Sequence, residues 1–196
     1  MFYALRNLFA LIGFLAVVVA IVLGVKMAPM KQAFDGFDER AMSVYSDMVE
    51  KLLETGNSAE ATVWKVPVND DLSAEDVEET MRFVANEHNI KNVGELPLSK
   101  QVEAMTGKKS RYLKIFMFCN ALTAAQMLEY SDAYSAYLPC RISLVEDKQG
   151  KLWLYSLNMD AMIYGGTPLP PALKEEAESV KAIILDIMKR GAEGDF

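Results

Sequence analysis

The sequence is poor in the residues from which most catalytic centres are built. It contains one histidine and two cysteines in 196 residues, and it has no glycine-rich phosphate loop and no Gly-x-Ser-x-Gly motif. A Ser–His–acid triad would therefore depend on His88 alone. The cysteines and the histidine match no zinc-binding spacing. We expect no metal and no cofactor, and an enzyme is the less favoured class of function.

Basic residues are scarce beyond the N-terminal segment. The chain has 20 Lys and Arg against 27 Asp and Glu, a formal net charge of −7. The first 31 residues carry Arg6, Lys26 and Lys31 and no acid, so the remainder has a charge of −10. Such a surface repels phosphate backbones, which excludes nucleic acid as a partner. The acidity either keeps the domain soluble or attracts a basic partner or cations.

One long hydrophobic run is present near the N-terminus. Leu8 to Val25 forms eighteen residues without a charge. As a helix this run is about 27 Å long, close to the thickness of the bilayer core. It is longer than the apolar core of a signal peptide and lacks an A-x-A cleavage site. We therefore predict an uncleaved membrane anchor over residues 1–31, with cleavage after the weak site Val22–Gly24 as the alternative.

The orientation of this anchor follows from the length of its N-terminal tail. Only seven residues precede the hydrophobic run, so the tail stays in the cytoplasm and the C-terminal domain is translocated. The two flanks of the anchor differ little in positive charge, so this charge adds little to the prediction of orientation. In a bacterium, these features predict a single-pass protein of the inner membrane with its C-terminal domain in the periplasm.

Small residues recur along one side of the predicted anchor: Gly13, Ala16, Ala20 and Gly24. Small side chains at four-residue spacing let the backbone of another membrane helix approach closely. This pattern predicts a transmembrane protein or complex as partner. The alternative is that alanine and glycine are simply common in membrane helices.

Beyond the anchor, the pattern predicts two further regions. Residues 32–58 form an amphipathic connecting helix, because Phe37, Ala41, Val44, Met48 and Leu52 recur at three- and four-residue steps. Residues 59–196 form a soluble α+β domain. Its predicted strands are 61–68, 91–96, 111–119, 140–146 and 151–157, and its predicted helices are 73–89, 99–105, 121–130 and one from 171 that stops at Gly191.

The last two strands flank Asp147–Gly150 and form a hairpin. Strands mixed with helices, together with one hairpin, favour a mostly antiparallel sheet covered on one face by helices.

Three short motifs carry a resemblance to a known family. They are Phe118-Cys119-Asn120, Leu138-Pro139-Cys140-Arg141-Ile142, and Val145-Glu146-Asp147 followed by Gly150 and Trp153. From about Ala61 to the C-terminus the chain resembles the domain of unknown function numbered 302. The resemblance implies a curved antiparallel sheet similar to the TATA-box-binding-protein architecture, and it carries no reaction. Anchored members resemble proteins of bacteria with sulfur-oxidising or related respiratory metabolism, so a respiratory complex is the implied kind of partner.

The two cysteines admit three interpretations. Cys119 and Cys140 form a disulfide, which an oxidising compartment would favour. Alternatively, both are buried inert thiols. In the third interpretation they form a reactive or sulfur-carrying site in which Asn120 and Arg141 orient or bind an anion.

A copper site is a further hypothesis, because thiols and thioethers are soft ligands that suit Cu(I). The candidate ligands are the two cysteines, His88, Met27, Met30, Met42 and Met48. Met42 and Met48 lie at or beside predicted core positions of the connecting helix, which weakens this pattern.

Three functions therefore remain. The leading hypothesis is a non-enzymatic accessory or binding module, tethered to the outer face of the membrane and associated with a membrane complex. The second is a thiol-based redox or sulfur-transfer protein that works through Cys119 and Cys140. The third is a small-ligand or copper binder.

Overall fold

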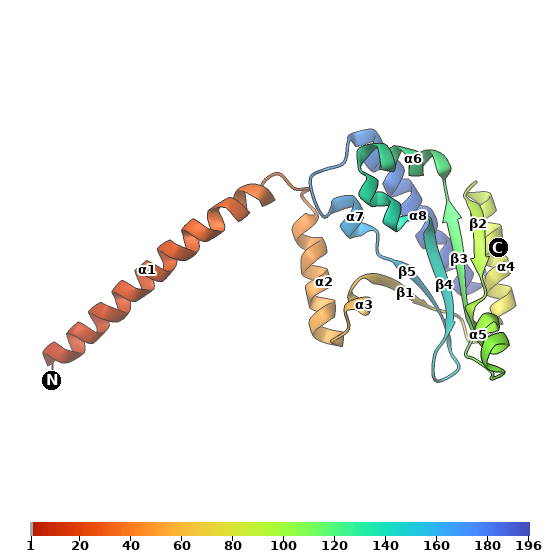
Figure 1. Cartoon of the computed structure of the whole chain (residues 1–196), viewed down its shortest axis with the longest axis horizontal. Helices are drawn as coiled ribbons and strands as arrows, with labels where there is room; N and C mark the ends of the chain where they lie inside the picture. Colours follow the sequence, from red (N-terminus) through yellow and green to blue (C-terminus); the bar gives the residue numbers. More distant parts are fainter. Residues whose placement is uncertain (1) are drawn as a thin grey trace.

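The computed structural model describes residues 2–196, apart from the side chains of residues 2–5, 8 and 27–33. Helix α1 (Phe2–Phe34) extends away from the rest of the chain (Figure 1). Its segment Phe9–Lys26 is long and apolar enough to cross a membrane, and none of it is buried inside the protein. The structure thus contains the helix that a membrane anchor requires. A signal sequence would have the same length and composition.

Two short helices follow α1, and one of them has two contrasting faces. Helix α2 (Ala41–Thr55) buries Ala41 and Val44 from the predicted apolar stripe. Gly56 ends it in the left-handed conformation, with φ of 64°. Helix α3 (Ser58–Ala61) then leads into the sheet. A second side of α2, which includes Leu53 at 80% exposure, is uncovered.

The sheet has five strands in the order β1-β5-β4-β3-β2, and every neighbouring pair is antiparallel. The strands are β1 (Val63–Pro67), β2 (Lys91–Leu96), β3 (Leu113–Cys119), β4 (Cys140–Glu146) and β5 (Leu152–Leu157). Together with the helices they confirm the predicted α+β fold and its antiparallel sheet. Phe116, Phe118, Ile142, Leu144 and Leu154 are fully buried at alternate positions.

Helices α4 (Ala74–Glu87) and α8 (Pro171–Glu193) cover the face on which these buried side chains lie (Figure 1). Ser73 and Asp76 form a capping box at the start of α4. The predicted stop of the last helix at Gly191 is wrong, because α8 continues to Glu193. Gly191 instead permits close packing: a β-carbon there would lie 2.6 Å from Cγ of Met81 on α4.

The remaining helices are α5 (Leu98–Thr106), α6 (Ala121–Tyr130), the 3-10 helix η1 (Asp132–Tyr137) and α7 (Asp160–Tyr164). The sheet face opposite α4 and α8 is called the open sheet face. Its side chains, given by the strand register, are all partly or fully exposed: Lys65, Ile115, Met117, Arg141, Ser143, Val145, Trp153 and Tyr155.

Candidate functional site

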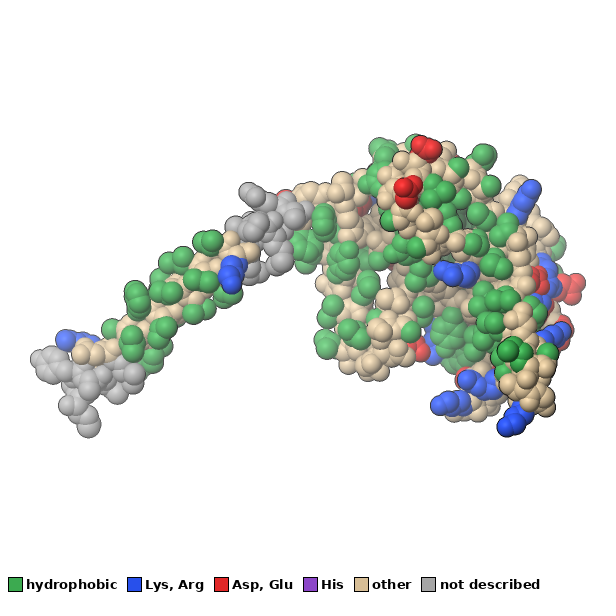
Figure 2. Space-filling view, viewed as in Figure 1, with side chains coloured by type: hydrophobic (Ala, Val, Ile, Leu, Met, Phe, Trp, Pro, Cys, Tyr) green, Lys and Arg blue, Asp and Glu red, His purple; other side chains and the backbone are tan. Residues whose placement is uncertain are grey.

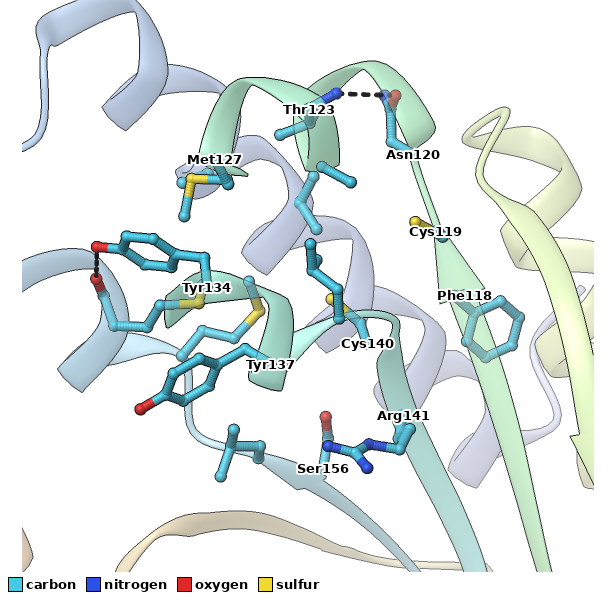
Figure 3. Close-up of a pocket in the computed structure, with 17 residues that line it drawn as sticks. Phe118, Cys119, Asn120, Thr123, Met127, Tyr134, Tyr137, Cys140, Arg141 and Ser156 are labelled. Carbon is cyan, nitrogen blue, oxygen red and sulfur yellow. Dashed lines mark hydrogen bonds between the residues drawn. The ribbon is translucent and has the colours of Figure 1, made fainter. Parts of the chain in front are cut away.

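A cavity lies at the end of the sheet where β3 and β5 finish and β4 begins (Figure 3). Its volume is about 50 Å³. Residues of α6, η1, α7 and α8 complete the wall, which is mostly apolar. The lining comprises Phe118, Cys119, Asn120, Thr123, Ala124, Met127, Tyr134, Tyr137, Leu138, Cys140, Arg141, Ser156, Leu157, Met159, Met162, Ala177 and Val180. The four residues singled out from the sequence, Cys119, Asn120, Cys140 and Arg141, are therefore all brought to one place.

Asn120 has a structural task at this site. Its side-chain oxygen accepts hydrogen bonds from the backbone N–H groups of Leu122, at 3.1 Å, and Thr123, at 3.4 Å (Figure 3). It is thus the N-cap of α6, as its position after a strand predicts. The cap occupies the amide oxygen only, and the amide N–H groups are the part of Asn120 that could donate to an anion.

The two cysteines are free thiols in the structure, so the predicted disulfide is not formed. The strand register offers a physical reason. Phe118 pairs with Cys140, which places Cys119 one residue further along β3. Successive side chains of a strand point to opposite faces, so the Cβ directions of Cys119 and Cys140 diverge. A disulfide between such positions requires the backbone to move.

Both thiols are held in their neutral form. Burial raises the pKa of Cys140 to about 11, with a further contribution from nearby Cys119 that outweighs the opposing effect of Arg141. Burial also raises the pKa of Cys119. A reactive cysteine requires the opposite shift, towards the thiolate. These electrostatics count against the redox or sulfur-transfer hypothesis.

Two hydroxyl groups of the cavity lining are paired within the protein. The Tyr134 hydroxyl donates to the backbone oxygen of Met162 at 3.2 Å (Figure 3). The Thr123 hydroxyl donates to Glu176 at 3.1 Å. No buried side-chain nitrogen or oxygen in the described part of the chain lacks a hydrogen-bond partner. The Tyr134 and Thr123 hydroxyls are therefore already engaged within the protein.

Sulfur is the feature that distinguishes the lining. Besides the two thiols, the thioethers of Met127, Met159 and Met162 line the same cavity. Met127 is 4% exposed and Met159 is 6% exposed, so both are held in place by packing. Sequence reasoning missed all three, because nothing in their spacing links α6 and α7 to the ends of the strands.

His88, Met42 and Met48, which the sequence offered as copper ligands, do not join this site. His88 ends α4, and its Nε2 lies 2.7 Å from Asp186 of α8. Met42 and Met48 belong to α2, while the side chains of Met27 and Met30 lie outside the described residues. Among the residues that the structure describes, no three His, Cys, Asp or Glu side chains gather as a metal site.

The predicted membrane-packing residues keep the face that the sequence suggested. Gly13, Ala16, Ala20 and Gly24 lie on α1 and are exposed. A β-carbon built at Gly13 or Gly24 would meet no atom within 4 Å. This side of α1 is therefore open to another helix, and nothing in the described chain identifies that helix.

The sequence model of a family described as "Domain of unknown function DUF302" matches residues 64–190. A solved structure, an uncharacterized conserved DUF302 protein from Bacillus stearothermophilus, aligns with 66% of this chain and 97% of its own, at a TM-score of 0.54 and 17% identity. At that identity the likeness shows the fold alone. No curated protein matches the chain.

Proposed function

Since the chain belongs to the DUF302 family, whose domain has no known function, we propose a function from its own site: it is a membrane-tethered binding module, and its cavity holds a small soft ligand. The observation that carries this proposal is the gathering of five sulfur-bearing side chains in one cavity. The thiols are protonated and the lining is mostly apolar, so binding without catalysis is the role that this lining favours.

The donor set favours Cu(I) as the ligand. Thiolate and thioether sulfurs prefer this ion, whereas Mg²⁺ and Ca²⁺ require carboxylate or carbonyl oxygens. The lining contains no Asp, Glu or His. A cavity of about 50 Å³ has room for an ion and a few water-sized groups, and is small for an organic cofactor.

Charge in the cavity is consistent with this ligand. On binding, each thiol releases its proton and the ion stays monovalent, so no electron is transferred. Two thiolates with one monovalent cation leave one negative charge, and Arg141 supplies a positive charge in the same lining. Met127, Met159 and Met162 are neutral donors that add coordination without adding charge.

The experiment is a competition titration of the reduced full-length protein, in mild detergent, against a chromophoric Cu(I) chelator. We expect one Cu(I) per chain, and an affinity at least 100-fold lower in the variant Cys119→Ser with Cys140→Ser. The control variant is Met105→Leu, which removes an 86% exposed thioether on α5 and should leave the affinity unchanged.

Thermal unfolding of each variant separates loss of ligand from loss of fold. Failure of the wild-type protein to compete with the chelator would refute copper binding. Equal binding by the double cysteine variant would show that the ion is held elsewhere on the chain.

A second candidate function concerns the membrane. We propose that the domain lies on the outer face of the inner membrane and that α1 associates with a transmembrane partner, for which a respiratory complex is one candidate. The exposed small-residue side of α1 supports this proposal. Ala16→Leu with Ala20→Leu should release co-purifying membrane proteins, while Val17→Leu with Ile21→Leu is the matched control. Unchanged co-purification in the first variant would refute it.

A further inference from the structure

The open sheet face is apolar and basic in an otherwise acidic protein. The charged residues that the strand register places on this face are Lys65, Lys91 and Arg141, and all three are basic and exposed. Lys65 lies over the ring of Trp153, with its nitrogen 4.4 Å from the ring centroid. Figure 2 shows blue side chains beside green ones over the sheet, whereas red ones gather at its margins. This face differs in sign of charge from the domain as a whole.

Helix α2 carries a complementary surface, called the α2 outer face. It forms a shallow groove lined by Met42, Tyr45, Ser46, Val49, Glu50, Leu53 and Glu54. Its apolar members are 41–80% exposed, and its charged members, Glu50 and Glu54, are both acidic. Figure 2 shows apolar side chains along α2. The groove is lined by residues of α2 alone, so nothing else in the described chain packs into it.

Helix α2 cannot turn this face onto its own sheet. Ala41 and Val44 are buried on its inner side. The Tyr45 hydroxyl also donates to the backbone oxygen of Gly165 at 2.6 Å, and this bond ties α2 to the end of α7. Because these contacts fix α2 in place, its acidic apolar face and the basic apolar sheet face of one chain stay apart. Each can be covered only by another molecule.

We infer that the occupant is a second copy of this chain, with the α2 outer face of each copy packed on the open sheet face of the other. An arrangement with twofold symmetry pairs both surfaces in both copies at once. Acidic Glu50 and Glu54 of one copy then lie against basic Lys65 and Arg141 of the other. The opposite charges of the two surfaces attract, which favours a second copy of this chain as the occupant. Tethering by α1 would raise the effective concentration of one copy around another.

The test is a charge swap in the full-length protein, reconstituted in lipid nanodiscs or mild detergent. We expect the wild type to contain two copies, by light scattering coupled to size-exclusion chromatography. Lys65→Glu alone and Glu50→Lys alone should each weaken association about tenfold. An equimolar mixture of these two variants should recover association, because each chain then offers the surface that the other requires.

Two further variants keep the test decisive. Val49→Asp with Leu53→Asp should give single copies, and both sites are exposed, so the thermal unfolding midpoint should stay unchanged. Lys189→Glu reverses an exposed charge on α8, on the helix-covered side, and should associate like wild type. Single-copy wild type at every concentration, or no recovery in the mixed sample, would overturn the inference. Copper binding is measured independently of it.

Discussion

Two regions of the domain use their partly buried side chains in opposite ways. One is a charge cluster of Glu78, Arg82, Glu95 and Lys114, which joins α4 to β2 and β3. The Lys114 nitrogen lies 2.6 Å from Glu78 and 2.8 Å from Glu95, while Arg82 lies 2.7 Å from each carboxylate. The other region is the sulfur-lined cavity, where the two thiols have no bonding partner. The cluster is saturated with partners and the cavity is not.

The pKa shifts report the same contrast. The hydrogen bond from Arg82 lowers the pKa of Glu95 to about 2, which keeps this carboxylate charged. Burial alone would raise the pKa of Glu78, yet bonds from Lys114 and Tyr112 bring it below its usual value. In the cavity, the effect of burial is larger than the opposing effect of Arg141, and the pKa of Cys140 rises to about 11. The charged side chains of the cluster bind one another and stabilise the fold. The thiols of the cavity have no such partner and are available to a ligand.

The largest effect should come from breaking the cluster. Glu78→Ala leaves Lys114 and Arg82 with one carboxylate fewer in a site where the Glu78 side chain is only 12% exposed. We expect a loss of about 3 kcal/mol in the free energy of unfolding, the usual cost of breaking a buried ion pair. Urea unfolding would measure it. Glu79→Ala is the matched control, since Glu79 is the exposed neighbour on the same helix, and it should change stability by less than about 0.5 kcal/mol.

The next effect separates the cavity from the cluster by reactivity. In a Cys119→Ser variant, iodoacetamide should label Cys140 more slowly than it labels the same cysteine in the unfolded chain at pH 7. The reason is that burial, the largest cause of the raised pKa of Cys140, remains when the contribution of Cys119 is removed, so the thiolate fraction stays low. Labelling as fast as in the unfolded chain would contradict the burial of this thiol. In wild type without reductant, absence of labelling that reductant restores would instead indicate a disulfide.

A pH titration of stability should show the cluster's contribution. The pKa of Glu95 is lower in the folded than in the unfolded chain, so its stabilisation is present above pH 4.5 and is lost as the pH falls towards 2. We expect Glu95 to contribute about 2 kcal/mol to the free energy of unfolding above pH 4.5. This is less than the difference between its folded and unfolded pKa would give in full, because the side chain is 25% exposed and partly screened by solvent. Urea unfolding between pH 5 and pH 2.5 tests it. The slope should be smaller in Glu95→Gln, and an equal slope would assign the acid sensitivity to other carboxylates.

Local patterns were sufficient to predict much of this fold. Strand 91–96 and helix 121–130 have the predicted bounds, and Ser73 and Asn120 cap the helices that follow them. Each of these features depends on residues that are close together in the sequence. The α+β class followed from the mixture of strands and helices, and the antiparallel sheet was confirmed.

The rest depended on contacts between distant residues. Gly191 has the sequence signature of a helix stop, but its place against Met81 and Leu154 is visible only once α8 packs on α4 and the sheet. The sequence singled out Cys119 and Cys140 together, and both line the cavity at one end of the sheet. The strand register, which sets the direction of each thiol, could not be read from spacing. Met127, Met159 and Met162 could be joined to them only by the way α6 and α7 close that end.

The smallest effect on stability should come from the cavity sulfurs, and it sharpens the comparison most. Met127→Leu exchanges side chains of nearly equal volume at a 4% exposed site, so unfolding free energy should fall by less than about 1.5 kcal/mol. The same change removes one soft donor, and Cu(I) affinity should fall about tenfold in the chelator competition. Glu78→Ala should show the reverse: large destabilisation, with unchanged Cu(I) affinity at temperatures where it stays folded. If Met127→Leu destabilised the protein without changing Cu(I) affinity, Met127 would serve to pack the core and not to bind copper. The contrast between the two regions would then not hold for this residue.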